Sequence, residues 1–193
     1  MSDCYEDLTL QSTSQLAEFA GSDAEFYNCR FEKIDFSALQ DEGFFPGKRF
    51  IDCEFLGANL SNQNLLNSLF RSCHFNQSKL LGLNWCSARP PEDLKFIDCQ
   101  MNLSVFQELD LEKTSFKGSS LREADFSRAK LQKASFEDCD LSGAVFNQAD
   151  LRAASFRGAV GYFVDPSITQ LKGAKFQMPE ALSLLRALEI DVD

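Results

Sequence analysis

"ASFEDCDLSGAVFNQADLRAASF", residues 134–156, repeats itself every five residues. The large apolar members of the repeat are Phe136, Leu141, Phe146, Leu151 and Phe156, and the small residues two positions before them are Ala134, Cys139, Ala144, Ala149 and Ala154. A helix face repeats after about 3.6 residues and a strand face after about 2, so neither element explains this period. A fixed repeat over many copies is typical of a solenoid, in which each unit buries its core against its neighbours.

The same five-residue register covers most of the chain in three runs. Its large positions are Phe26, Phe31 and Phe36; then Phe50, Phe55, Leu60, Leu65, Phe70, Phe75, Leu80 and Trp85; then Phe96, Met101, Phe106, Leu111, Phe116, Leu121, Phe126, Leu131, Phe136, Leu141, Phe146, Leu151 and Phe156. The rule of a small residue two positions earlier has exceptions at Ile34, Lys48, Gln63, Leu83, Leu94 and Leu109.

A second period of twenty residues lies above the first. Phe and Leu alternate after Met101, and the second run has the order Phe, Phe, Leu, Leu followed by Phe, Phe, Leu, Trp. A square coil with four five-residue sides would produce both orders. Phe would then stack on Phe and Leu on Leu in successive coils, which would lie about 4.8 Å apart like neighbouring strands. We therefore expect an inward core stack of Phe116, Leu121, Phe126, Leu131, Phe136, Leu141, Phe146, Leu151 and Phe156.

Three short motifs resemble the A-(D/N)-L-x-x motif of the pentapeptide-repeat family. They are "ANL" at 58–60, "ADF" at 124–126 and "ADL" at 149–151. The resemblance covers about residues 24–160 and implies an all-β fold, a right-handed quadrilateral parallel β-helix. We expect one solenoid domain over residues 1–193, with the β-helix at 24–176 and a short helix and strand at 177–193.

Composition indicates a protein without membrane segments. No stretch approaches 18 consecutive apolar residues, so no transmembrane helix is expected. The opening "MSDCYEDLTLQ" lacks the basic and apolar regions of a signal peptide, which predicts a cytoplasmic location.

The seven cysteines predict neither a metal site nor a disulfide framework. Five of them occupy the small inward position, where cysteine serves as a small buried hydrophobe; they are Cys29, Cys53, Cys73, Cys99 and Cys139. Cys4 and Cys86 fall outside that position and are expected to be more accessible.

No catalytic motif is present in the sequence, so an enzyme, a cofactor and a metal are not expected. The single histidine, His74, precedes Phe75 on an outward position and is expected on the solvated surface. Acids such as Asp110, Asp125, Asp140 and Asp150 occupy the D/N position of the motif, which predicts a structural role. Lys130 lies one coil from Asp110 and from Asp150, so a ladder of charges between coils is expected.

The net charge of −10 is confined to one part of the chain. Residues 1–112 hold 18 acidic and 8 basic residues, whereas residues 113–193 hold 11 of each. An acidic surface repels nucleic acid and attracts a basic partner. Solubility alone is the alternative explanation.

The register breaks twice. Phe36 and Phe50 are 14 residues apart, which predicts an outward loop at 37–49 with Phe45 as the centre of a side. Trp85 and Phe96 are 11 apart, and Pro90 and Pro91 predict a bulge at 86–95, which either relieves a slip in register or binds a partner. The candidate partner contacts are Asp41, Glu42 and an exposed Phe44 in the loop, and Arg89, Glu92 and Asp93 in the bulge.

The tail predicts a helix with an apolar stripe. Pro179 suits the first turn of a helix, and the stripe consists of Ala181, Leu184, Leu185 and Leu188. Ile190 and Val192 then alternate like a short strand. The stripe would cap the open end of the coil or join two chains as a homodimer.

The two breaks and the tail are similar to the topoisomerase-protecting branch of the family, which includes quinolone-resistance proteins of the Qnr type and microcin-immunity proteins of the McbG type. This resemblance implies a tail-to-tail dimer that mimics DNA and binds DNA gyrase and topoisomerase IV, with no nucleic acid and no membrane as partner. The neutral charge of residues 113–193 departs from that expectation, because they would lie nearest the dimer axis. The alternative is a non-catalytic adaptor solenoid with an unrelated protein partner.

Overall fold

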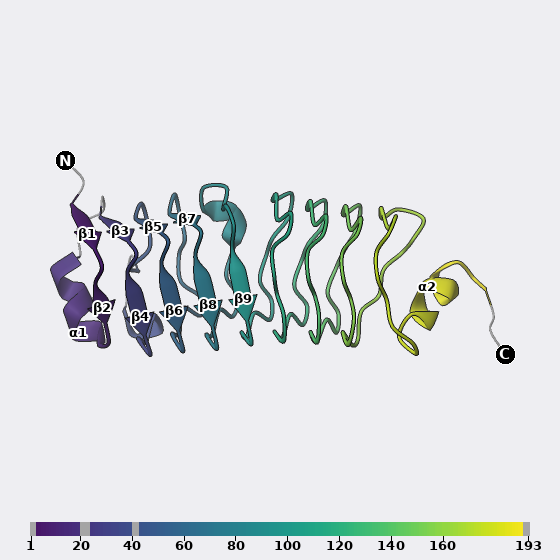
Figure 1. The fold of residues 1–193 in the computed structure, drawn as a ribbon, viewed down its shortest axis with the longest axis horizontal. Helices are drawn as coiled ribbons and strands as arrows, with labels where there is room; N and C mark the ends of the chain where they lie inside the picture. Colours follow the sequence, from purple (N-terminus) through teal and green to yellow (C-terminus); the bar gives the residue numbers. More distant parts are fainter. Residues whose placement is uncertain (1–2, 20–23, 40–42, 191–193) are drawn as a thin grey trace.

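Stacked parallel coils form a rod in the computed structural model, which describes residues 3–19, 24–39 and 43–190 (Figure 1). Its strands are β1 (Cys4–Glu6), β2 (Thr9–Leu10), β3 (Glu25–Tyr27), β4 (Arg30–Glu32), β5 (Arg49–Ile51), β6 (Glu54–Leu56), β7 (Leu69–Arg71), β8 (His74–Asn76) and β9 (Lys95–Ile97). Its helices are α1 (Thr13–Leu16), α2 (Leu182–Ala187) and the short 3₁₀ helices η1 (Ala17–Phe19), η2 (Phe36–Ala38) and η3 (Trp85–Ser87). Helices α1 and α2 lie at opposite ends of the rod (Figure 1).

Parallel pairing between successive coils generates four faces. On the first face, β1, β3, β5 and β7 pair in that order, and a single bridge joins Arg71 to Glu92. In the later coils, bridges continue the same face from Asp110 through Lys130 and Asp150 to Gln170. On the second face, β2, β4, β6, β8 and β9 pair, followed by Ser115, Ser135, Ser155 and Lys175. The third face carries bridges from Asp35 to Val160, and the fourth from Asn84 to Val145. The fold is the predicted right-handed quadrilateral β-helix.

Aromatic side chains stack along the inside of the rod. The rings of Phe96 and Phe116 lie 5.3 Å apart, and those of Phe116 and Phe136 lie 5.1 Å apart and nearly parallel. Phe50 stacks on Phe70 at 5.0 Å, as the twenty-residue period predicts. All members of the expected core stack are buried, namely Phe116, Leu121, Phe126, Leu131, Phe136, Leu141, Phe146, Leu151 and Phe156.

The small inward position is also buried, which confirms the prediction for the cysteines. Cys29, Cys53, Cys73, Cys99 and Cys139 are free and buried, whereas Cys4 and Cys86 are free and exposed. The Cys73 thiol donates to the Phe50 carbonyl of the preceding coil at 3.3 Å. Burial raises the pKa of Cys73 to about 12.

The coil begins earlier than residue 24, so the predicted N-terminal boundary is wrong. Strand β1 pairs with β3, placing Tyr5 beside Phe26, and β2 pairs with β4, placing Leu10 beside Phe31. Tyr5 and Leu10 are five residues apart, but α1 and η1 follow them in place of further sides. Two repeats are too few to reveal a period in the sequence.

Most corners of the coil have a left-handed residue two positions after the large one, and the corners formed by η2 and η3 are exceptions. Positive φ recurs at this position, for example at Glu123, Arg128 and Lys133, with φ between 57° and 60°. Gly118 fills one such corner, where a Cβ would collide with the Asp98 carboxylate of the preceding coil. The five-residue period is therefore a backbone requirement as well as a packing one.

The D/N position of the motif stabilises the corner that follows it. The Asp125 carboxylate accepts a hydrogen bond from the Ser127 N–H at 2.8 Å, and Asp140 does the same for Ser142 at 3.0 Å. Asn59 accepts from the Ser61 N–H at 3.2 Å, so an amide serves as well as a carboxylate. These are Asx turns, which explain why the motif selects Asp or Asn.

Of the two predicted ion pairs of Lys130, the one with Asp110 forms and the one with Asp150 does not. Lys130 Nζ lies 3.4 Å from Asp110 Oδ2. Asp150 instead pairs with Arg152 two residues on and accepts from Gln132 Nε2 at 2.6 Å.

The C-terminal helix begins later than predicted. Helix α2 starts at Leu182, after a turn that contains Pro179, and Ile190 is not in a strand. Val192, the other residue of the predicted strand, lies outside the described residues. Leu184 packs against the core of the rod, and it therefore caps the open end of the coil.

The inward position of Ala124 yields a stability prediction. Ala124→Leu should lower the free energy of unfolding by about 1–3 kcal/mol, because the filled interior has no room for a larger side chain. Lys117→Leu, at an exposed position of the same region, is the matched control and should change stability little. Urea unfolding of the two variants tests this, and equal losses would contradict the inward assignment.

A second prediction concerns how the stability of the fold depends on pH. Hydrogen bonds from Arg152 hold the pKa of Asp150 below its usual value, so this pair stabilises the fold above the unfolded pKa of about 3.9 and loses its effect as pH falls through the lowered folded pKa. Asp150→Asn should therefore cost at most about 1 kcal/mol at neutral pH, since Arg152 is half exposed, and this cost should shrink as pH falls through the lowered folded pKa. Arg152→Gln should show the same convergence with wild type. Stability curves that stay parallel at all pH values would contradict the assignment.

Candidate functional site

The described residues offer little for catalysis. They contain no group of three or more His, Cys, Asp and Glu side chains that could hold a metal ion. The only histidine, His74, is partly buried in β8 beside Glu54 of the preceding coil. Over the same residues, no helix is long and apolar enough to cross a membrane.

The first register break differs from the predicted loop. Asp41 and Glu42 lie outside the described residues. Phe44 is 4% exposed, so its predicted role as an exposed contact is wrong. Its ring packs beside Phe36 and Phe26, with centroids 5.4 and 5.9 Å away. The interior of this longer coil accepts both Phe44 and Phe45, which are adjacent in sequence, and the four extra residues therefore do not all point outward.

The second break places Pro91 at the centre of a side. Pro91 is buried, and Glu92, next to it, bridges to Arg71 on the first face. Pro91 therefore takes the place of a Leu or Phe, and the extra residue lies between Trp85 and Pro91. This bulge starts with η3, where the Asn84 side chain accepts from the Cys86 N–H at 3.1 Å.

Beside the bulge, the backbone ladder of the first face is interrupted. In the following coil Leu111 N donates to Lys130 O at 2.8 Å, and Lys113 N donates to Gln132 O at 2.9 Å. The equivalent residues one coil earlier are Pro91, which has no N–H, and Asp93. Among the described residues, no backbone hydrogen bond joins 90–93 to 110–112.

The interruption is limited to one face. At the same level of the rod, Phe96 N donates to Ser115 O at 2.7 Å on the second face. Met101 N donates to Ser120 O at 2.7 Å on the third face. We call the unpaired junction between 90–94 and 110–114 the open seam.

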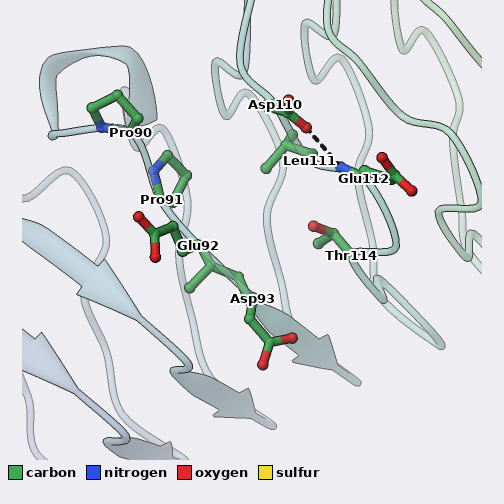
Figure 2. Close-up of a pocket in the computed structure, with 9 residues that line it drawn as sticks. Pro90, Pro91, Glu92, Asp93, Asp110, Leu111, Glu112 and Thr114 are labelled. Atoms are coloured by element: carbon green, nitrogen blue, oxygen red, sulfur yellow. Dashed lines mark hydrogen bonds between the residues drawn. The ribbon is translucent and has the colours of Figure 1, made fainter.

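A hollow of about 340 Å³ lies in the open seam (Figure 2). Pro90, Pro91, Glu92, Asp93 and Leu94 line it from one coil, and Asp110, Leu111, Glu112 and Thr114 line it from the next. The lining is mainly apolar, with carboxylates around it.

Most of the carboxylates around the hollow are already paired with neighbours. Glu92 lies 2.8 Å from Arg71 in the preceding coil, and Glu112 lies 3.2 Å from Lys133 in the following one. The hydrogen bond from Lys133 lowers the pKa of Glu112. Asp93 is exposed, occupies a left-handed corner with φ 49°, and has no ion pair or hydrogen bond within the described residues.

Of the predicted contacts in the bulge, the structure brings Glu92 and Asp93 to the hollow and leaves Arg89 outside its lining. Arg89 is exposed, and its N–H donates to the Ser68 carbonyl at 2.8 Å. Asp110, Leu111, Glu112 and Thr114 were missed, because only the twenty-residue period connects them with the bulge.

Residues 92–178 match the family model described as pentapeptide repeat region. Residues 92–178 therefore form a pentapeptide-repeat region.

Two solved structures of pentapeptide-repeat proteins are similar to this chain. Full-length QnrB1, a plasmid-mediated fluoroquinolone resistance protein, is 18% identical, with 97% of this chain and 100% of QnrB1 covered and a TM-score of 0.42. HetL, involved in heterocyst differentiation regulation in the cyanobacterium Nostoc, is 21% identical, with 90% of this chain and 84% of HetL covered and a TM-score of 0.44. No curated protein matches the sequence.

The charges of the pentapeptide-repeat rod change sign along its first face. Before residue 113 its outward residues are mainly acidic, with Arg49 and Arg71 as the bases; the acids are Glu6, Asp7, Glu25, Asp52, Glu92, Asp93, Asp110 and Glu112. Beyond that point the outward residues are mainly basic, with Asp150 as the acid; the bases are Lys113, Lys130, Lys133, Arg152 and Lys172. The excess of acid in the sequence is thus concentrated on one face.

The fourth face of the rod carries both apolar and charged residues and ends at a second hollow. Its outward residues include Asn84, Val105, Asp125 and Val145, and its corner residues Glu108 and Arg128 form an ion pair. A hollow of about 320 Å³ is lined by Gly143–Asn147, Phe163 and Asp165. The Phe163 side chain is 60% exposed there. Sequence reasoning did not identify this residue, since the repeat has decayed by that point.

The residues of the predicted dimer stripe differ in burial. Ala181, Leu184 and Leu185 are half-buried, whereas Leu188 is 47% exposed. Leu184 packs on the core of its own chain, and Leu185 and Leu188 are not among the residues that do so.

Proposed function

We propose that this pentapeptide-repeat protein binds DNA gyrase and topoisomerase IV in place of DNA and protects them from a quinolone or a microcin-type toxin. The observation that supports the proposal best is the acidic first face of the rod, over residues 4–112. Its carboxylates stand on a straight, rigid scaffold, as phosphates do on a duplex. A surface that binds DNA is basic, so it attracts such a face.

In the proposed action, the protein binds the topoisomerase and catalyses no reaction. The rod would occupy the DNA-binding surface of the topoisomerase and displace DNA from a poisoned cleavage complex. The acids nearest the open seam and the acidic end of the rod would form the contact, and the basic residues beyond Lys113 would lie outside it. Such a partner places the protein in the cytoplasm.

The second candidate is an adaptor solenoid, and the exposed Phe163 at the end of the fourth face favours it. Phe163 and the adjoining hollow would then form the contact with a protein whose surface is apolar. A protein that uses this face would bind with little dependence on salt, whereas binding through the first face should weaken as salt rises.

We expect Asp52→Asn with Asp93→Asn to weaken gyrase protection, because these two exposed corner acids of the first face have no ion pair within the described residues. Glu123→Gln with Asp138→Asn removes the same charge from corners in the C-terminal half and is the matched control. The measurement is gyrase supercoiling with and without a quinolone, at two salt concentrations. Melting temperatures of all variants should match wild type.

Wild-type protein that neither inhibits supercoiling nor relieves the poison at micromolar concentration would reject the proposal and leave the adaptor function. Deletion of 41–44 is unsuitable as a test of the first loop, since Phe44 belongs to the core. Asp41→Asn with Glu42→Gln tests that loop without removing Phe44.

A tail-to-tail homodimer accompanies this proposal. Leu185→Glu with Leu188→Glu should give a monomer, because both side chains lie outside the core packing of Leu184. Arg186→Glu, an exposed position on the same helix, is the control and should leave the dimer intact. Sedimentation velocity measures the result, and a wild-type monomer at micromolar concentration would exclude the dimer.

A further inference from the structure

The hollow in the open seam has the size of a site for a single side chain. Its volume of about 340 Å³ lies at the lower end of the range for small-ligand pockets, about 300–1,000 Å³. It is formed by two segments of backbone that regular coils would join with hydrogen bonds. A strand or a helix of a partner would need a longer groove, and the intact ladders of Phe96 and Met101 limit the opening to one face.

The walls of the hollow suit an apolar stem. Pro90, Pro91, Leu94 and Leu111 are the apolar residues of its lining, which is mainly apolar. Figure 2 shows Pro90 and Pro91 on one side and Leu111 and Thr114 on the other. Aliphatic carbons placed between them would lose contact with water, which is favourable.

The polar groups at the opening are hydrogen-bond acceptors. In regular coils the carbonyls at these positions, Lys130 O and Gln132 O, accept from the preceding coil. The equivalent carbonyls at the seam are those of Asp110 and Glu112, and neither accepts a hydrogen bond within the described residues. Asp93 adds a carboxylate without an ion pair there.

An arginine side chain combines the required features. Its methylene stem is apolar, and its planar guanidinium presents five N–H donors and a permanent positive charge. A lysine has the stem and the charge but only a compact ammonium head, which reaches fewer acceptors. A phosphate or a carboxylate would meet acidic groups and carbonyl oxygens and would be repelled.

We propose that the open seam is a binding site for an arginine side chain of a protein partner. The stem lies between Pro91 and Leu111, and the guanidinium donates to the Asp93 carboxylate and to the carbonyls of Asp110 and Glu112. This inference deepens the proposed function, because it names the group on a basic partner surface that anchors the acidic face. It requires no topoisomerase for its test.

The test is an NMR titration of the ¹⁵N-labelled full chain with N-acetyl-arginine amide. The citrulline analogue, which has the same shape but no charge, is the comparison ligand. Arginine should shift the amides of Asp93, Leu94 and Glu112 saturably, with Kd on the order of millimolar. Citrulline should bind at least about tenfold more weakly, because hydrogen bonds to a charged group are stronger.

Two variants and one control locate the site. Asp93→Asn removes the charge and should weaken arginine binding about tenfold. Pro91→Leu supplies the missing N–H and a central Leu like Leu111, so it should close the seam and abolish binding while the chain stays folded. Asp98→Asn changes a similar corner with φ 53° that does not line the hollow, and it should bind arginine as wild type does.

Equal binding of arginine and citrulline, or wild-type affinity in Asp93→Asn or Pro91→Leu, would overturn the inference. Failure here with gyrase protection intact would reject the arginine site alone. Arginine binding without any effect on gyrase would reject the proposed function and leave the site.

Discussion

The hydrogen-bond ladder between successive coils is the constraint on which the rest of the structure depends. Because each coil pairs in parallel with the next, every residue must lie above its equivalent one turn earlier. Phe116 thus stacks on Phe96, and Phe136 on Phe116. The corner after each side needs a left-handed residue to keep this register, and an Asx turn often supports it, as between Asp125 and Ser127. Where Pro91 supplies no N–H, the ladder of the first face is interrupted, and the hollow lies at that interruption.

The repeat made the coil predictable because one short rule specifies the backbone, the core and the stacking together. The same rule failed wherever a coil departs from twenty residues. Phe44 looked like a loop residue, but the longer second coil has interior space for it beside Phe36. Tyr5 and Leu10 begin the coil, yet two repeats before a helix carry no detectable period.

The candidate site was predictable only in part for a similar reason. Adjacent prolines signal a local break in a ladder, so Glu92 and Asp93 could be selected from the sequence. The opposite wall of the hollow, with Leu111 and Thr114, consists of ordinary repeat residues. They line a hollow only because the coil before them contains the two prolines, and nothing in their own segment of sequence indicates this. Phe163 was missed because its exposure depends on how the last coil ends.

Three cysteines stacked in the N-terminal coils would allow the opening of individual coils to be measured chemically. Cys29, Cys53 and Cys73 occupy the same inward position of the second face in successive coils, and all are buried. Since burial raises the pKa of Cys73 to about 12, its thiol remains protonated and hidden from alkylating reagents while the coil is closed. Each thiol can react only when its own coil opens. The order in which the three are modified would therefore record how the rod frays from its N-terminal end, one turn at a time.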